Sequence, residues 1–342
     1  MPGKSLHIKL ASTVLFLFVA CVSYSQQQAQ YSQYLINEYL VNPALSGVED
    51  FVDIKVGYRT QWVGIDNHPE TYYLSAHASI GKSNGAMTHK SDYGNWHGVG
   101  GLFYRDKTGP TSQTSAYLNY AYNLKITQGE GFNVHHKDGI RLSFGTFIGL
   151  NQYTIDGSQL TAEQADDIAI VGNSQTTTLP DASIGGMLYF RDQYFVGLSA
   201  FQLLGSKIEF NEPGTPSSNN NLTEDGKLTR HYYLSFAYKK KIKDDFYFIP
   251  SSLVKFTSPA PVSVDLNAWL DYKDIIYGGI SYRTGDAVGI IIGTLLFEQV
   301  EFYYSYDYTL SELNVQSQGS HEITLGYRIL SKFKDRNHSQ FK

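Results

Sequence analysis

Residues 320–329, near the end of the chain, alternate between two kinds of side chain without a break. His321, Ile323, Leu325, Tyr327 and Ile329 fall on one parity, and Glu322, Thr324, Gly326 and Arg328 fall on the other. Successive side chains of a β-strand point to opposite faces. The segment therefore predicts a strand with one largely apolar face and one charged face, as in a barrel with lipid outside and water inside.

Fourteen segments of this kind follow one another, separated by clusters of Gly, Asn, Asp and Pro that favour turns. We expect strands at residues 51–60, 71–80, 96–106, 112–125, 140–151, 182–191, 194–204, 230–241, 246–256, 263–271, 275–283, 286–295, 299–308 and 320–329. A tilted strand needs about 9–11 residues to cross a bilayer. The sequence predicts an all-β fold, a transmembrane antiparallel β-barrel of about 14 strands, with twelve and sixteen left open.

The only long apolar run lies at the N-terminus, before the first of these segments. Two lysines precede an apolar stretch at residues 10–22, and small residues follow it. The stretch is shorter than the roughly 20 residues of a membrane-spanning helix. The pattern predicts a secretory signal peptide at residues 1–25, cleaved between Ser25 and Gln26.

The chain has a single cysteine, Cys21, which lies within that signal. Cleavage after Ser25 would leave a mature chain that can form no disulfide and no thiolate-based metal or catalytic site. The competing interpretation is a lipoprotein signal. Residues 18–21 loosely resemble a lipoprotein cleavage box, which would keep Cys21 as a lipidated N-terminus.

Composition agrees with an outer-membrane barrel. The chain has 27 Tyr and 19 Phe, but only 17% charged residues, against roughly 25% in an average soluble domain. Outer-membrane barrels combine aromatic girdles with polar lumens. The net charge of −5 and the lack of a basic patch predict no nucleic-acid partner. A secreted, soluble, Tyr-rich all-β protein is the alternative class.

An even number of strands places both chain ends on one side, which we expect to be the periplasm. The long connections at 152–181, 205–229 and 309–319 then face outward, whereas those at 81–95 and 126–139 are long connections on the periplasmic side. The predicted organisation is a signal peptide (1–25), an N-terminal periplasmic or plug segment (26–50), the barrel (51–330) and a C-terminal tail (331–342).

Few residues suggest chemistry. The candidate metal ligands are His135, His136 and Asp138 in one loop, and Glu163, Asp166 and Asp167 in another. Neither set has the spacing of a known site, and a solvated loop is the simpler interpretation. Ser75 and His77 share one face of a predicted strand, but no acid that would orient the His is identifiable. We expect no catalytic residue, no metal, no cofactor and no enzymatic activity.

Separate motifs occur in order along the chain. They are QYSQY at 30–34, NPALSG at 42–47, YRTQWVGI at 58–65, SYDY at 305–308 and GSHEITLGYRI at 319–329. This set resembles the PorP/SprF family of type IX secretion system membrane proteins of Bacteroidota, over nearly the whole mature chain. The family ordinarily ends near its last strand, so the basic tail at 331–342 departs from it.

The resemblance implies a barrel in the outer membrane, surrounded by its lipid, that serves protein secretion. Such a barrel would bind and help to secrete, display or anchor a cell-surface protein, including a gliding adhesin, or would contact the periplasmic secretion ring. The implied partners are a secreted type IX cargo protein or its C-terminal domain, and other type IX secretion components. The alternative function is a passive porin or a lipophilic-solute channel.

The candidate partner-binding residues are Asn42, Pro43, Arg59, Gln61 and Trp62. Residues 26–50 would fold at the periplasmic mouth or enter the lumen, and Arg59 would hydrogen-bond that segment or a bound cargo tail. Alternatively, Arg59 pairs with a lumenal acid such as Glu322 or Asp307. Replacing Arg59 by Ala should impair cargo display in the first case, with the heat stability of the barrel intact, and should impair barrel assembly in the second.

Overall fold

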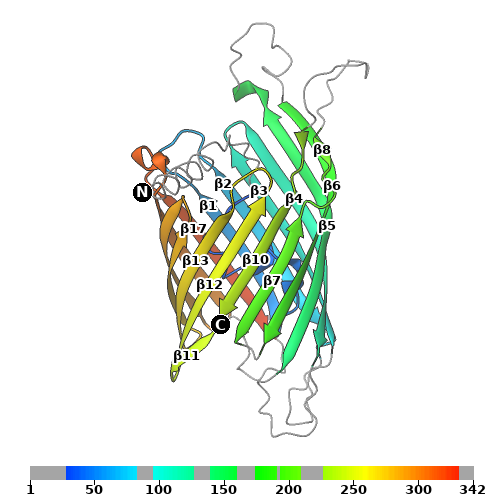
Figure 1. Ribbon diagram of the computed structural model, residues 1–342, viewed down its shortest axis with the longest axis vertical. Coiled ribbons are helices and arrows are strands. Elements are labelled where there is room, and N and C mark those ends of the chain that lie inside the picture. The colour runs from blue at the N-terminus through cyan, green and yellow to red at the C-terminus, as the bar shows by residue number, and fades with distance from the viewer. Residues whose placement is uncertain are drawn as a thin grey trace, which may run out of the picture.

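The computed structural model describes residues 28–82, 95–126, 139–159, 174–190, 193–208 and 226–330. Within them the chain forms a closed antiparallel β-barrel of fourteen strands (Figure 1). Both the predicted signal peptide and the C-terminal tail lie outside the described residues. No helix among the described residues is long and apolar enough to cross a membrane.

The barrel strands follow one another around the cylinder in chain order. They are β1 (Phe51–Thr60), β2 (Glu70–Ile80), β3 (Trp96–Thr108), β4 (Thr111–Lys125), β5 (Ile140–Asp156), β6 (Ser174–Phe190), β7 (Tyr194–Phe201), β10 (His231–Tyr238), β12 (Phe246–Thr257), β13 (Ser263–Tyr272), β14 (Ile276–Arg283), β15 (Ala287–Leu296), β16 (Val300–Thr309) and β17 (Ser320–Leu330). A short strand, β11 (Lys240–Lys243), pairs only with β12. A two-stranded ribbon is formed by β8 (Lys207–Ile208) and β9 (Gly226–Lys227).

The first and last strands close the cylinder. β1 and β17 pair antiparallel from Phe51 opposite Leu330 to Thr60 opposite His321. β10 pairs with β7 on one side and with β12 on the other. Each barrel strand therefore has two neighbours, which satisfies backbone groups that would be costly to leave unpaired in lipid and leaves no open edge.

The alternating residues of each strand point to opposite sides: one parity faces the lumen, and the other faces outward. On β17, Glu322 and Thr324 are buried, whereas Leu325 is exposed. At the middle of β4, the Leu118 side chain is 77% exposed, whereas its neighbour Asn119 is buried. Exposed Leu, Ile, Val and aromatic side chains recur along the strands. They form the apolar outer surface that a lipid-embedded barrel requires.

The two ends of the barrel differ. We call the end where β1 begins and β17 ends the termini end, and the opposite end the loop end. The loop end carries the connections 61–69, 157–173, 202–230 and 310–319. Aromatic pairs lie near both ends, for example Tyr58 with Tyr72 and Tyr194 with Tyr238, whose ring centroids are 4.8 and 4.6 Å apart. Aromatic rings suit the boundary between lipid and water.

All fourteen predicted strands are present, but the predicted connection at 152–181 is wrong at both of its ends. β5 continues to Asp156 and β6 begins at Ser174, and the two strands pair throughout this extension. The prediction failed because the outward face, which is apolar elsewhere on these strands, is polar here, at Gln152, Thr154 and Thr176. A strand that rises above the bilayer no longer needs an apolar face.

Candidate functional site

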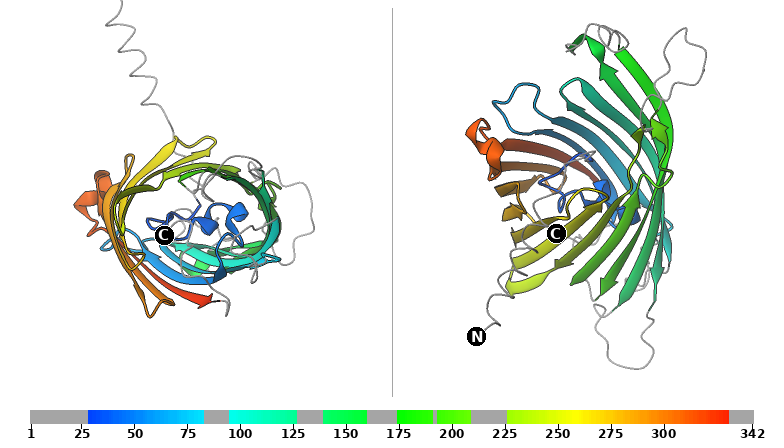
Figure 2. Two further views of the ribbon diagram at one scale, coloured as in Figure 1. Left: turned by 90° about the horizontal axis from the view of Figure 1, so that it is seen from below. Right: turned by 45° about the horizontal axis from the view of Figure 1, so that its top comes forward.

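Residues 28–50, here called the lumen segment, lie inside the cylinder, as the view along the barrel in Figure 2 shows. They bond to strands on different sides of the wall. Asn37 Nδ2 donates to Ser75 Oγ on β2 (2.8 Å), and the Tyr34 hydroxyl lies 3.2 Å from Ser251 Oγ on β12. The lumen segment therefore crosses the interior of the barrel.

A tight turn at Asn42 and Pro43 forms the centre of the lumen segment. One residue, Val41, separates this turn from the preceding short helix η1 (Glu38–Leu40). Pro43 is the first residue of the next short helix, η2 (Pro43–Leu45). Asn42 Oδ1 accepts from the Ala44 N–H (3.0 Å), and Nδ2 donates to the Gly186 carbonyl (3.1 Å). Pro at the first helical position loses no hydrogen bond. The Asn-Pro-Ala sequence thus encodes a capped turn that is fixed to β6.

Side chains of the barrel wall hold this turn by hydrogen bonds to its backbone carbonyls. Wall side chains donate to five of its carbonyls: Ser199 Oγ to Val41 (2.5 Å), Asn119 Nδ2 to Pro43 (3.0 Å), Ser143 Oγ to Ala44 (2.5 Å), Asn123 Nδ2 to Ser46 (3.4 Å) and Trp96 Nε1 to Gly47 (2.7 Å). Buried carbonyls need such partners. The donors come from β3, β4, β5 and β7, so one side of the cylinder forms a seat for residues 41–47.

Glycines let the turn approach the wall closely. A Cβ atom placed on Gly98 would lie 2.0 Å from the Ser46 carbonyl oxygen, and one on Gly145 would lie 2.3 Å from that of Pro43. On Gly185, a Cβ would lie 2.1 Å from Asn42 Oδ1. Ordinary van der Waals contact begins at 3.4 Å. Any larger residue at these positions would therefore push the lumen segment away from the wall.

Near the loop end, the lumen segment is held by a buried charge network around Arg59. The Arg59 guanidinium contacts Asp307 (3.0 Å), Glu322 (3.3 Å) and Ser32 Oγ (2.6 Å), and the residue is only 1% exposed. The Ser32 N–H donates to Glu322 (2.7 Å), and its hydroxyl donates to Asp307. Arg59 therefore makes both kinds of contact considered from the sequence, with the lumen segment and with the two acids.

A second cation, Arg283, extends this network around the barrel. It contacts Asp265 (3.2 Å) and Asp286 (2.9 Å), and its Nη2 donates to the Tyr31 carbonyl (3.5 Å). Lys255 pairs with the same Asp265 (2.8 Å). Paired and hydrogen-bonded charges of this kind tolerate burial, whereas a single unpaired one would not. Charged side chains of the barrel wall thus surround the start of the lumen segment.

Beyond the barrel strands, two loop-end connections join into one surface, here called the rim platform (residues 61–65 and 310–319). Val63 N–H donates to the Gly319 carbonyl (2.9 Å), and Gln318 N–H donates to that of Val63 (2.6 Å). The short helix η4 (Glu312–Val315) belongs to the platform, and its last residue, Val315, is 86% exposed. The rim platform offers apolar side chains to solvent at the loop end.

Trp62 lies in the rim platform with an unusual backbone. Its φ angle is +51°, and its N–H donates to Ser320 Oγ (3.1 Å). Positive φ is rare for a bulky residue and is found mainly where the surroundings enforce it, often at functional positions. Gln61, beside it, is buried, and its N–H donates to the Pro69 carbonyl (2.9 Å).

The five sequence-predicted site residues therefore fall in three places rather than one. Asn42 and Pro43 form the turn against β4 to β6, Arg59 lies in the charge network, and Gln61 and Trp62 belong to the rim platform. Sequence reasoning missed Ser32 and Arg283. The inward parity of Arg283 on its strand was a usable signal, whereas nothing in the sequence marks Ser32 as the partner of Arg59.

The residues considered for catalysis do not form a catalytic arrangement. Asp53 lies opposite His77 in the β1–β2 register, at 3.7 Å from its Nε2, so an acid does approach this His. Ser75 Oγ, however, accepts a hydrogen bond from Asn37, and among the described residues no Ser75–His77 hydrogen bond is found. The described part of the chain also contains no group of three metal-ligating side chains. The loop ligands from His135 to Asp167 lie outside the described residues.

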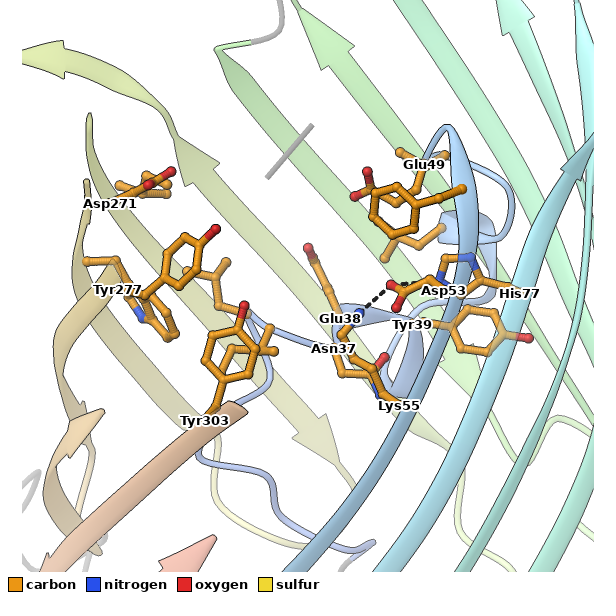
Figure 3. A pocket seen from close by; sticks show the side chains of 17 residues that line it. Asn37, Glu38, Tyr39, Glu49, Asp53, Lys55, His77, Asp271, Tyr277 and Tyr303 are labelled. Carbon is orange, nitrogen blue, oxygen red and sulfur yellow. Dashed lines mark hydrogen bonds and ion pairs between the residues drawn. The ribbon is translucent and has the colours of Figure 1, made fainter. Parts of the chain in front are cut away.

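A cavity remains between the lumen segment and the wall (Figure 3). We call it the aromatic cavity; its lining includes Glu38, Tyr39, Trp269, Asp271, Tyr277 and Tyr303. Its volume is about 60 Å³. A water needs roughly 10–15 Å³ by that measure. The cavity therefore holds a few waters or one small group.

Fold and site define a membrane-spanning β-barrel whose lumen is occupied by a segment of its own chain. Residues 23–327 match the model of the family described as type IX secretion system membrane protein PorP/SprF, and the chain belongs to that family. The protein is thus an outer-membrane barrel of the type IX secretion system, and this family is not a class of enzymes.

Some solved structures are similar to this chain at low sequence identity. Omp33, an outer membrane protein of Acinetobacter baumannii, is 7% identical, with 83% of this chain and 100% of that chain covered and a TM-score of 0.42. The toluene transporter TbuX of Ralstonia pickettii is 8% identical, with coverage of 87% and 93% and a TM-score of 0.46. A FadL homologue of Pseudomonas aeruginosa is 10% identical, with coverage of 86% and 93% and a TM-score of 0.45. None of the curated proteins matches the chain.

Proposed function

We propose that this barrel is a docking protein for secretion rather than an open channel. It binds an exported cell-surface protein, such as a gliding adhesin or the C-terminal domain of another type IX cargo, and helps to secrete, display or anchor it. The observation that carries the proposal is the filled lumen. Side-chain donors from four strands hold residues 41–47 in place, and Arg59 holds Ser32. We expect a segment fixed in this way to leave no wide aqueous path.

The rim platform is the proposed contact surface for the exported protein. Val315 and Leu313 are exposed there, and Trp62, with its positive φ, belongs to the same platform. Apolar and aromatic side chains presented together on a supported loop are typical of protein-binding surfaces. In the proposed orientation both chain ends lie in the periplasm, so the rim platform faces the cell surface, where a displayed protein would be held.

The test is a pull-down of the tagged protein from outer membranes, with the bound proteins identified by mass spectrometry. The double substitution Trp62→Ala with Val315→Ser should abolish recovery of a type IX cargo protein. The matched control is Phe297→Ser, which removes an 88% exposed aromatic residue from a turn at the termini end. If the control variant loses a type IX ring component instead, the termini end is the docking face. Recovery of general porins alone, by the wild type as well, would refute the docking role.

The alternative is a passive porin or lipophilic-solute channel, and its electrical behaviour differs. A barrel occupied by residues 28–50 should be silent in a planar bilayer, because about 60 Å³ of water-accessible space in the aromatic cavity is no continuous pore. Large currents without any added partner would favour the porin. The same measurement also tests whether residues 26–50 act as a plug.

A further inference from the structure

Glu38 in the lumen segment is a buried carboxylate without a cation. The residue is 6% exposed, and its Oε2 has no hydrogen-bond partner among the described residues. Burial raises the pKa of Glu38 to about 7, and a hydrogen bond with Ser235 opposes this effect only in part. Burying a carboxylate is costly unless a positive charge compensates it.

The cations near the aromatic cavity are engaged by other acids. Lys55 pairs with Asp53 and lies 3.7 Å from Glu301, which also binds Arg328. No described Lys or Arg forms an ion pair with Glu38. The remaining charged or titratable groups that line the cavity are Tyr39 and Glu49 of the lumen segment, His77 of β2, Asp271 of β13, Tyr277 of β14 and Tyr303 of β16. Acidic side chains thus outnumber Lys and Arg side chains in the lining.

The opposite wall of the cavity is aromatic. Tyr277 and Tyr303 lie with ring centroids 5.7 Å apart, and Trp269 is beside them. Figure 3 shows the Glu38 carboxylate directed into the space between the lumen segment and these rings. Asp271 is 1% exposed, and its Oδ2 also makes no hydrogen bond within the described chain. Aromatic faces attract cations, and a carboxylate facing several rings is the usual design for binding an organic cation.

We propose that the aromatic cavity is a binding site for one organic cation, the ammonium or guanidinium group of a Lys or Arg side chain. The group would pair with Glu38 and lie against the rings of Tyr277 and Tyr303. The size of the cavity suits one such group, and its polar and aromatic lining does not suit an anion. This inference is independent of the proposed docking role.

Two sources could supply this cation. Phe51 lines the cavity and pairs with Leu330, so the basic tail at 331–342 begins at the same end of the barrel. That tail contains Lys332, Lys334, Arg336 and Lys342. The other source is a separate protein that presents Lys or Arg at the termini end. The chemistry of recognition is the same in both cases.

The test is the binding of argininamide to the purified, full-length barrel in detergent, followed as a shift in its thermal transition. We expect saturable stabilisation by argininamide, in the wild type or, if the basic tail fills the cavity, in the tail variant described below. We expect none by Nα-acetylcitrullinamide, which carries no cation, at equal ionic strength. In Glu38→Gln the apparent Kd should rise at least about tenfold, which corresponds to the loss of one ion pair at roughly 1.4 kcal/mol per factor of ten. The control is Glu298→Gln, which removes an exposed carboxylate at the same end of the barrel.

A second variant, with Lys332, Lys334, Arg336 and Lys342 all changed to Gln, identifies the source. If only this variant binds argininamide, the tail of the chain itself occupies the cavity. If the wild type binds it equally well, the site is open to a partner. Both results support the site. Absence of saturable binding in both proteins, or equal binding by Glu38→Gln, would overturn it.

Discussion

The close contact between the lumen segment and the barrel wall can be tested by adding one methyl group to the wall. In Gly98→Ala, the new Cβ would lie 2.0 Å from the Ser46 carbonyl oxygen and 2.4 Å from its carbon. Both are backbone atoms, so no side-chain rotation can relieve the overlap. Ser46 must move by about 1.4 Å to reach the 3.4 Å at which ordinary van der Waals contact begins.

Such a shift should break the hydrogen bonds nearest to Ser46. These are Asn123 Nδ2 to the Ser46 carbonyl (3.4 Å) and Trp96 Nε1 to the Gly47 carbonyl (2.7 Å). Each contributes about 0.5–1.5 kcal/mol, so docking of the segment should weaken by about 1–3 kcal/mol. The undocked population should then rise roughly fivefold to 150-fold.

Limited proteolysis measures this population, because cleavage follows the opened state when opening is fast. Buried Glu38 is the cleavage site for a Glu-specific protease, and the resulting fragment is quantified by mass spectrometry. Gly101→Ala on the same strand is the control, since its Cβ would come no closer than 3.4 Å to Tyr117. Equal cleavage rates after Glu38 in the two variants would refute the tight seating inferred for the segment.

Three further outcomes are expected. Arg59→Ala should lower the free energy of unfolding by about 3–5 kcal/mol, because Glu322 stays buried without a cation and Asp307 keeps only Arg283, at 3.9 Å; a denaturant midpoint measures it, and neutralising Glu322 as well should restore most of the loss. Leu118→Arg should cost about 2–4 kcal/mol if that side chain faces the bilayer centre, whereas unchanged heat-dependent gel mobility would contradict a lipid-facing position. Since burial raises the pKa of Glu38 to about 7, its negative form grows with pH, and argininamide affinity should increase about tenfold from pH 6 to pH 8.

The strands were predictable because lipid imposes a rule on each of them separately. An apolar residue at every second position is a local constraint, and β1 therefore has the same bounds in sequence and structure. The extension of β5 and β6 above the bilayer was not predictable, because the constraint ends where lipid ends. Polar strands there differ little in pattern from polar loops.

The candidate site was predictable only in its parts. Arg59 was expected to point inward from parity alone, and its acids followed from the adjacency of the first and last strands. The partner Ser32 depends on the path of the lumen segment, which has no periodic pattern. Its position is set by contacts with strands far along the sequence, such as Ser32 with Glu322, and no local propensity encodes them.

The two groups of contacts that hold the lumen segment come from strands in different parts of the sequence. Asn42 and its neighbours are held by β3 to β7, whereas Ser32 is held by β16 and β17, the last strands to be made. The β1–β17 pairing that closes the cylinder thus includes Glu322, which holds the start of the lumen segment. Closure of the cylinder and retention of the start of the lumen segment therefore depend on the same strand, β17, and opening of the β1–β17 pairing should also release Ser32.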